Sequence, residues 1–285
     1  LVPETIPIME KRLSDHLPLM EEKYPYDVWL LACYDVVLDE NGCLQKGQRI
    51  DPDAEAEGTK WYVYVEALRP ISWFNGQTYV DTMNPKAIQK FIDVTYERYL
   101  ETVGQDFGGL IPAIFTDEPQ FVRKKELGFA REKRDVILPW TEDVPQTYLA
   151  AYGEDIWEKL PELLWNLPEG QVSTTRYHYH DHVAARFAEA FADQCGAWCA
   201  DHNLMLTGHM MEEPTLESQT AALGEAMRSY RGFQLPGIDM LCNSFEFTTA
   251  KQAQSASRQF GREGVLSELY GVTGWDFDFR GHKLQ

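Results

Sequence analysis

The sequence lacks an excess of positive charge, a long apolar run and a targeting segment. Its 26 Lys and Arg residues stand against 45 Asp and Glu, which gives a net charge of −19 at pH 7. Nucleic acids and anionic membranes bind cationic surfaces, so we expect neither as a partner. No stretch approaches the roughly 20 apolar residues of a membrane-spanning helix, and no signal peptide opens the chain, so the sequence leaves the compartment open.

Cysteines are also scarce, and their spacing forms no framework. There are five, an odd number, with no Cys-x-x-Cys pair. This pattern argues against a fold held by disulfides. Cys195 and Cys199 lie four residues apart on a predicted helix, and we expect both to be small buried core residues.

The two ends of the chain lack the features of natural termini. The chain begins Leu1-Val-Pro without a methionine, and it ends in the polar segment 280–285 without completing another element. We therefore expect a piece excised from a longer, multidomain protein.

Alternating elements fill most of the chain. Short β-branched apolar runs are followed by segments of helical periodicity, and no internal repeat is present. The predicted elements are strands at Val28–Val37 and Trp61–Leu68, a helix from Asn84-Pro85 to Gly104, a strand at Gly109–Thr116, a helix from Thr174 to His202, strands at Leu204–His209 and Gly237–Asn243, a helix at Thr248–Gly261 and a strand at Gly264–Tyr270.

This alternation predicts parallel strands joined by helical crossovers. The glycine-rich turn of a dinucleotide site is missing, while polar residues gather where strands end. Carboxylates at the ends of several strands are typical of barrel active sites. The sequence therefore predicts an α/β fold, a (β/α)8 TIM-like barrel, in part incomplete, as one catalytic domain over residues 1–285. Four prolines break up residues 122–170, which we interpret as an insertion at the rim of the pocket.

Glu118 and Glu268 are the strongest candidates for catalysis. Each follows a predicted apolar strand, so each would enter the pocket at the mouth of the barrel. Cleavage of a glycosidic bond needs one protonated carboxyl and one carboxylate that acts as base or nucleophile. Two carboxyls on opposite sides of one barrel would supply both. A helix N-terminal charge or a structural ion pair is the alternative for either residue alone.

Further polar and aromatic residues are expected to bind the substrate. Glu212 and Glu213 compete with Glu118 for the role of acid. Asp117 should point away from Glu118 if the strand stays extended, and His209 follows a glycine that allows a close backbone approach. Aromatic rings among these groups suit the flat faces of sugars. The predicted substrate-binding residues are Asp117, His209, Glu212, Glu213, Asn243, Tyr270 and Trp275.

A histidine cluster offers an alternative function, that of a metal-dependent hydrolase. His178 and His182 lie at i and i+4 on the predicted long helix. No glutamate of a His-Glu-x-x-His motif accompanies them, and they fall in mid-helix. We therefore assign no metal-binding residues and predict no required cofactor.

Two segments near the C-terminal end resemble a known family. Lys251-Gln-Ala-Gln-Ser-Ala-Ser-Arg-Gln-Phe-Gly-Arg262 and Val265-Leu-Ser-Glu-Leu-Tyr-Gly-Val-Thr-Gly-Trp-Asp276 look like bacterial proteins related to the α-L-rhamnosidases of glycoside hydrolase family 106. Thr116-Asp-Glu-Pro-Gln-Phe121 is similar to the Asn-Glu strand end of clan A glycosidases, with Asp117 in place of the asparagine.

The resemblance implies a fold, an activity and a cofactor. It implies that Glu118 closes the fourth strand of a barrel and Glu268 the seventh, as acid/base and nucleophile. It also implies flanking β-sandwich domains and brings a calcium ion into consideration. Family 106 is associated with inversion and clan A with retention, and the sequence does not choose between them.

Together these observations predict a glycosidase that acts on a carbohydrate, an α-L-rhamnoside or a related plant-polysaccharide linkage. The rival interpretation, from another functional class, is a carbohydrate-binding or scaffold barrel without catalysis. Sugar binding without turnover would favour that rival.

Overall fold

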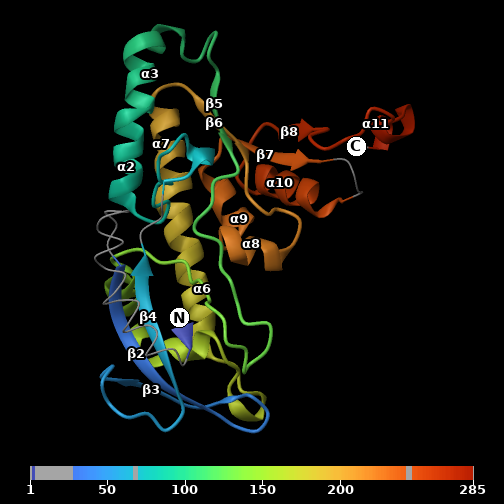
Figure 1. The fold of residues 1–285 in the computed structure, drawn as a ribbon. Coiled ribbons are helices and arrows are strands. Elements are labelled where there is room, and N and C mark those ends of the chain that lie inside the picture. The colour runs from blue at the N-terminus through green and yellow to red at the C-terminus, as the bar shows by residue number, and fades with distance from the viewer. Residues whose placement is uncertain (1, 4–27, 67–69, 242–245, 285) are drawn as a thin grey trace. The chain divides into compact units, whose positions relative to one another are not determined.

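The computed structural model describes residues 2–3, 28–66, 70–241 and 246–284 (Figure 1). These residues form two compact units. Unit 1 holds residues 1–79, 124–138 and 142–182, and unit 2 holds residues 80–123, 139–141 and 183–285. That both units form one catalytic domain stays a prediction.

Unit 1 contains an antiparallel sheet with the strand order β1-β4-β2-β3. Its strands are β1 (Val2–Pro3), β2 (Val28–Leu38), β3 (Leu44–Ile50) and β4 (Thr59–Glu66). The short segments around the sheet are η1 (Ser72–Phe74), α4 (Val144–Tyr152), α5 (Ile156–Lys159), η3 (Leu160–Leu163), η4 (Pro168–Gly170) and the first part of α6 (Thr174–Phe187).

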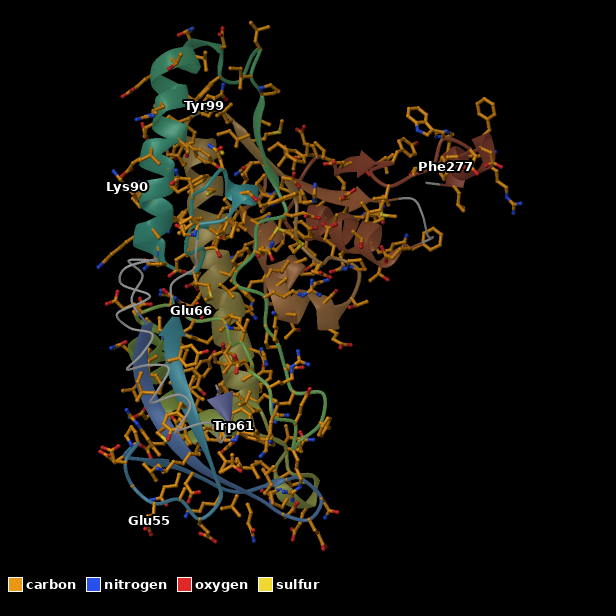
Figure 2. All side chains as sticks on the ribbon, in the orientation of Figure 1. Glu55, Trp61, Glu66, Lys90, Tyr99 and Phe277 are labelled. Carbon is orange, nitrogen blue, oxygen red and sulfur yellow. The ribbon has the colours of Figure 1, made fainter. Side chains whose placement is uncertain are left out.

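Aromatic packing and one buried carboxylate stabilise unit 1. Trp61 of β4, labelled in Figure 2, packs edge-on against Trp165 with ring centroids 4.9 Å apart. Asp35 of β2 is buried and accepts hydrogen bonds from Lys46 Nζ at 2.8 Å and from the Gly58 amide at 2.8 Å. Asp35 is therefore a structural residue of this sheet.

Unit 2 is built on a parallel sheet with the consecutive strand order β5-β6-β7-β8. The strands are β5 (Ala113–Asp117), β6 (Met205–His209), β7 (Leu235–Met240) and β8 (Leu266–Leu269). Register pairs Asp117 with His209 and Asp239 with Glu268. Because parallel strands run in one direction, these four polar residues lie at the same edge of the sheet.

Helices connect and cover the parallel strands (Figure 1). Helix α7 packs on β6 and α10 on β7. Within unit 2 the helical segments are α2 (Pro85–Val94), α3 (Tyr96–Val103), η2 (Gly104–Asp106), the end of α6, the π-helical η5 (Ala188–Asp193), α7 (Gln194–Asp201), α8 (Leu216–Ala222), α9 (Ala226–Ser229), η6 (Tyr230–Gly232), α10 (Thr248–Gln259) and α11 (Phe279–Leu284).

The start of α2 follows from its sequence. The Asn84 side chain accepts hydrogen bonds from the amides of Lys86 and Ala87, and Pro85 occupies the first turn. Ile88 and Ile92 of α2 are buried. Figure 2 labels Lys90 of α2 and Tyr99 of α3. The predicted helix is nevertheless divided at its middle, between α2 and α3.

The cysteine prediction is confirmed. Cys195 and Cys199 of α7 are both fully buried and carry free thiols. Burial raises the pKa of each thiol to about 12. Both are therefore unreactive core residues.

The prediction of a (β/α)8 TIM-like barrel is wrong. The two N-terminal runs expected as parallel barrel strands, β2 and β4, pair antiparallel, with Cys33 opposite Tyr62. The described residues contain four parallel strands in one sheet and no closed eight-stranded barrel. The excursion predicted at residues 122–170 belongs mostly to unit 1 with the antiparallel sheet, not to an insertion in a barrel.

None of the helices in the described part of the chain combines the length and the apolar character that crossing a bilayer requires.

Candidate functional site

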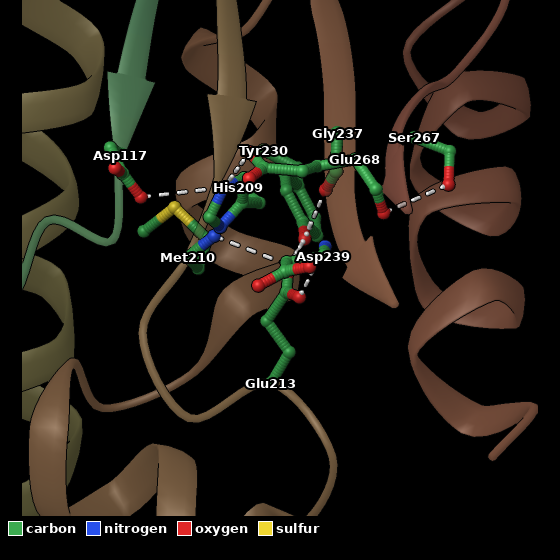
Figure 3. Close-up of polar contacts among 9 residues, drawn as sticks. All are labelled: Asp117, His209, Met210, Glu213, Tyr230, Gly237, Asp239, Ser267 and Glu268. Atoms are coloured by element: carbon green, nitrogen blue, oxygen red, sulfur yellow. Dashed lines mark hydrogen bonds and ion pairs between the residues drawn. The ribbon is translucent and has the colours of Figure 1, made fainter. Parts of the chain in front are cut away.

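The candidate site lies in unit 2, at the C-terminal edge of the parallel sheet, and His209 is its centre (Figure 3). His209 ends β6, and its side chain is almost completely buried. Its Nε2 lies 3.0 Å from Oε2 of Glu268 and 3.4 Å from Oδ1 of Asp117. The histidine therefore joins side chains from the first and the last strand of the sheet.

Gly208 lets β5 and β6 approach each other beside this histidine. It adopts a φ of 126°, and a Cβ added there would lie 1.9 Å from the carbonyl oxygen of Thr116 in β5. The close neighbour of Gly208 is thus the backbone of the next strand. A close approach of a ligand at this glycine stays a prediction.

The backbone of Glu118 turns out of the strand directly after β5. Its φ is +48°, a left-handed conformation that residues other than glycine rarely adopt, and its amide donates to the His209 carbonyl at 3.2 Å. The expectation that Asp117 points away from Glu118 required a continuing strand. Because the strand ends at Asp117, the carboxyls of both residues lie near His209.

Burial and neighbouring charges change the acidity of the site. Burial raises the pKa of Glu118, and the negative charges of Asp117, Asp239 and Glu212 raise it further against the opposing effect of His209. Burial also raises the pKa of Asp239, and Glu268 and Asp117 add to that effect. Both carboxyls therefore keep a proton to higher pH than a free carboxyl would.

Glu118, His209 and Asp239 form a group that could hold a cation. One possible ligand atom from each residue lies within 4.8 Å of the other two. Among the described residues, Nδ1 of His209 and Oδ1 of Asp239 are buried atoms without a hydrogen-bond partner. Carboxylate oxygens suit calcium, whereas an imidazole nitrogen suits zinc, copper, iron or nickel better. The carboxylate part of the group thus fits a calcium ion.

Glu212 and Glu213 separate into two environments. Glu212 has a φ of +56° and forms an ion pair with Arg123. Glu213 is buried, and its carboxylate accepts hydrogen bonds from the amides of Met210 and Asp239 and from the hydroxyl of Tyr230. Burial raises the pKa of Glu213 to about 7. Its carboxyl is therefore bonded within the protein.

The remaining candidates lie in other surroundings. Tyr270 packs against Phe277, labelled in Figure 2, and against His282, with ring centroids 5.7 and 5.1 Å away. The Trp275 side chain is fully exposed to solvent. Asn243, predicted at a strand end, lies outside the described residues. Substrate binding by these three residues stays a prediction.

The histidine cluster belongs to unit 1. His178 stacks on Tyr152 with centroids 4.3 Å apart, and His182 Nε2 lies 2.9 Å from the Thr147 hydroxyl. His180 lies 3.4 Å from Lys124 Nζ, and burial lowers its pKa to about 4. The three histidine rings therefore pack α6 against neighbouring segments of unit 1.

Sequence reasoning missed Asp239 and Tyr230. A signal for Asp239 exists, because it is a single charge in the otherwise apolar segment Leu235–Met240. Burying a charged residue inside such a strand costs free energy unless the charge is paired and hydrogen-bonded, so its presence indicates a specific role. Tyr230 carries no comparable signal, since a buried tyrosine is ordinary in a core.

The comparisons with known proteins give a distant likeness to solved structures only. No family model and no curated protein matches the chain. A solved structure of a rhamnosidase from Novosphingobium sp. PP1Y is similar, with 18% sequence identity and a TM-score of 0.49. The similarity covers 81% of this chain and 21% of that one, so this chain spans about a fifth of the length of the rhamnosidase.

Proposed function

We propose that this chain carries the catalytic site of a glycoside hydrolase, with Glu118 as general acid and Glu268 as base or nucleophile. The observation that supports the proposal most directly is the convergence of both carboxyls on His209. Glycosidases hold their two carboxyls about 5–5.5 Å apart for retention and about 6.5–9.5 Å apart for inversion, so this chemistry needs both carboxyls in one site.

The roles follow from the surroundings of each carboxyl. Glu118 is half-buried with a raised pKa, which favours the protonated form that a general acid must have. Its proton would go to the glycosidic oxygen as the bond to the sugar breaks. Glu268 is exposed and held by His209 at 3.0 Å. Its carboxylate would either take a proton from the attacking water or attack the sugar itself.

The substrate would be a carbohydrate, with an α-L-rhamnoside as the first candidate. Asp117 has an exposed carboxylate that could accept a hydrogen bond from a sugar hydroxyl. Arg123 holds Glu212 at the same end of the sheet, and Tyr270 and Trp275 offer rings to flat sugar faces. Besides the carbohydrate substrate, the proposed partners of this chain are flanking domains of a longer protein.

The cofactor proposed for this site is a calcium ion, which the two-carboxylate chemistry itself does not require. Glu118 and Asp239 would hold it through oxygen atoms, and water or sugar hydroxyls would complete its ligands. When bound, such an ion orients sugar hydroxyls and offsets the negative charge of the site.

The test measures hydrolysis of aryl glycosides by the full chain and by Glu118→Gln and Glu268→Gln. We expect losses on the order of 10²–10⁴-fold for both variants. A leaving group that needs no protonation should restore much of the rate in Glu118→Gln and little in Glu268→Gln. The exposed Glu217 of α8 supplies the matched control Glu217→Gln, which should retain full activity.

Near-full activity of both variants, with circular dichroism unchanged, would overturn the proposal. Calorimetric sugar binding without turnover across a broad panel of glycosides would replace it with the non-catalytic alternative.

A further inference from the structure

The strands β6 and β7 separate just before the candidate site. Their ladder consists of two pairs, Thr207 with Leu235 and Gly208 with Pro236. Pro236 has no amide hydrogen with which to continue the ladder. His209 and Asp239 lie beyond the last pair, so ordinary sheet pairing does not fix the distance between them.

One carboxylate spans the gap between the separated strands (Figure 3). Oε1 of Glu213 accepts a hydrogen bond from the Met210 amide at 3.2 Å, and Oε2 accepts one from the Asp239 amide at 3.1 Å. Met210 directly follows His209, and Asp239 belongs to the site itself. Beside the site, the side chain of Glu213 therefore replaces the backbone hydrogen bonds that β6 and β7 no longer form with each other.

Tyr230 fixes the carboxylate from a third direction. Its hydroxyl lies 2.8 Å from Oε1 of Glu213 and 2.9 Å from the carbonyl oxygen of Gly237 in β7. Tyr230 and Glu213 are both buried, so water does not compete for these bonds. The phenol thus ties the carboxylate to the same strand that carries Asp239.

The main chain of Glu213 is held as firmly as its side chain. Its carbonyl accepts hydrogen bonds from Gln219 Nε2 at 2.7 Å and from Gln252 Nε2 at 3.1 Å. Gln219, on α8, is fully buried, and Gln252 belongs to α10. A buried side chain with this many partners has little freedom to swing toward a substrate.

We propose that Glu213 is a positioning residue, whose bridging carboxylate sets the spacing of His209 and Asp239, and that it does not bind the substrate. This role deepens the proposed glycosidase function and rests on it. The alternative from sequence, in which Glu213 replaces Glu118 as acid, would require its carboxyl to face the substrate.

The test replaces Glu213 with glutamine in the full chain. The glutamine side chain has one acceptor oxygen and one NH2 donor group. It therefore cannot accept hydrogen bonds from the Met210 and Asp239 backbone amides at its two ends, as the glutamate does. We expect amide hydrogen exchange to accelerate at least tenfold at these two positions. Exchange at Leu206, whose amide donates to Gln234 Oε1 at 2.7 Å, should stay unchanged. A merely structural role would accelerate exchange at all three amides together.

Catalysis supplies a second readout. We expect kcat of Glu213→Gln to fall at least tenfold with KM within about threefold of wild type, while Glu217→Gln leaves both unchanged. Glu213→Asp keeps two acceptor oxygens on a shorter side chain and should recover part of the loss. If Glu213→Gln does not fold, Glu213→Asp takes its place. We then expect a smaller acceleration of exchange at the Met210 and Asp239 amides, again with none at Leu206.

The two proposals fail in different ways. A wild-type chain that hydrolyses no glycoside overturns the proposed function, and the exchange measurement still decides whether Glu213 holds the strand ends. Unchanged exchange at Met210 and Asp239 would overturn the positioning role. Accelerated exchange with unchanged kcat in an active enzyme would also overturn it.

Discussion

His209 of β6 contacts Glu268 of β8 across the intervening strand, with 3.0 Å between Nε2 and Oε2. A contact between strands that are not neighbours requires a long side chain on at least one of them, pointing along the edge of the sheet. This contact holds one proposed catalytic carboxylate at a fixed place.

The first prediction concerns the pH dependence of the proposed acid. The charge of Glu212 is one of the influences that raise the pKa of Glu118. Glu212→Gln removes that charge, so the pKa of Glu118 should fall. The protonated acid would then be lost at lower pH, and the alkaline limb of the kcat/KM profile should move to lower pH. A limb that stays in place, or moves upward, would contradict the role of Glu118 as acid.

The second prediction concerns stability and Glu213. Its pKa rises from 4.5 to about 7 on folding, so the folded state binds the proton more tightly. The resulting stability is present in full below pH 4.5 and is lost as pH rises to about 7. Urea unfolding should show a loss of about 3 kcal/mol over this window in wild type. The loss should disappear in Glu213→Gln, and an equal loss in the variant would contradict the assignment.

The third prediction concerns Gly208. Gly208→Ala places a Cβ against the Thr116 carbonyl and forces a side chain into a φ of 126°. We expect the free energy of unfolding to fall by about 3 kcal/mol. Gly264→Ala is the control, because a Cβ there meets only ordinary contact at 3.8 Å. Equal stability of the two variants in urea would show that β5 and β6 are not in close contact at this point.

The fourth prediction concerns the proposed cation. Asp239→Asn removes a charge from the group formed with Glu118 and His209. Calorimetric titration with calcium chloride should show affinity reduced on the order of tenfold or more. Asp201→Asn, at the exposed end of α7, should bind calcium as wild type does. Binding that is absent from wild type, or equal in both variants, would remove calcium from the proposed site.

Local signals in the sequence predict much of unit 2. Asn84 and Pro85 mark the start of α2, and the apolar runs before Asp117 and His209 become β5 and β6. These signals depend on neighbouring residues alone. The gathering of polar residues at the ends of parallel strands follows from the same alternation of elements.

The antiparallel sheet was open to prediction in part. Asn41 and Gly42 lie between β2 and β3, and Gly42 adopts a φ of 81° in the turn. An Asn-Gly pair flanked by strand-like runs is a strong hairpin signal. The alternation of strands and helices elsewhere in the chain obscured that signal, and two antiparallel strands were interpreted as barrel strands.

The arrangement of the acids could not be predicted from the sequence. The left-handed backbone of Glu118, at φ +48°, brings its carboxyl near His209 together with that of Asp117, whereas a continuing strand would have placed the two on opposite sides. Glu212 and Glu213 are identical in type and adjacent, and only the positive φ of Glu212 and the partners of Glu213 distinguish them. Such choices depend on contacts between segments far apart in the chain.

The bridge made by Glu213 has a consequence for how the site could evolve or be redesigned. Backbone pairing fixes the separation of adjacent strands at about 4.8 Å, whatever the sequence. Between His209 and Asp239 a side chain takes over that role, so its length and chemistry set the spacing of these two residues. Single substitutions at position 213 are therefore a route to change this spacing while β6 and β7 keep their register.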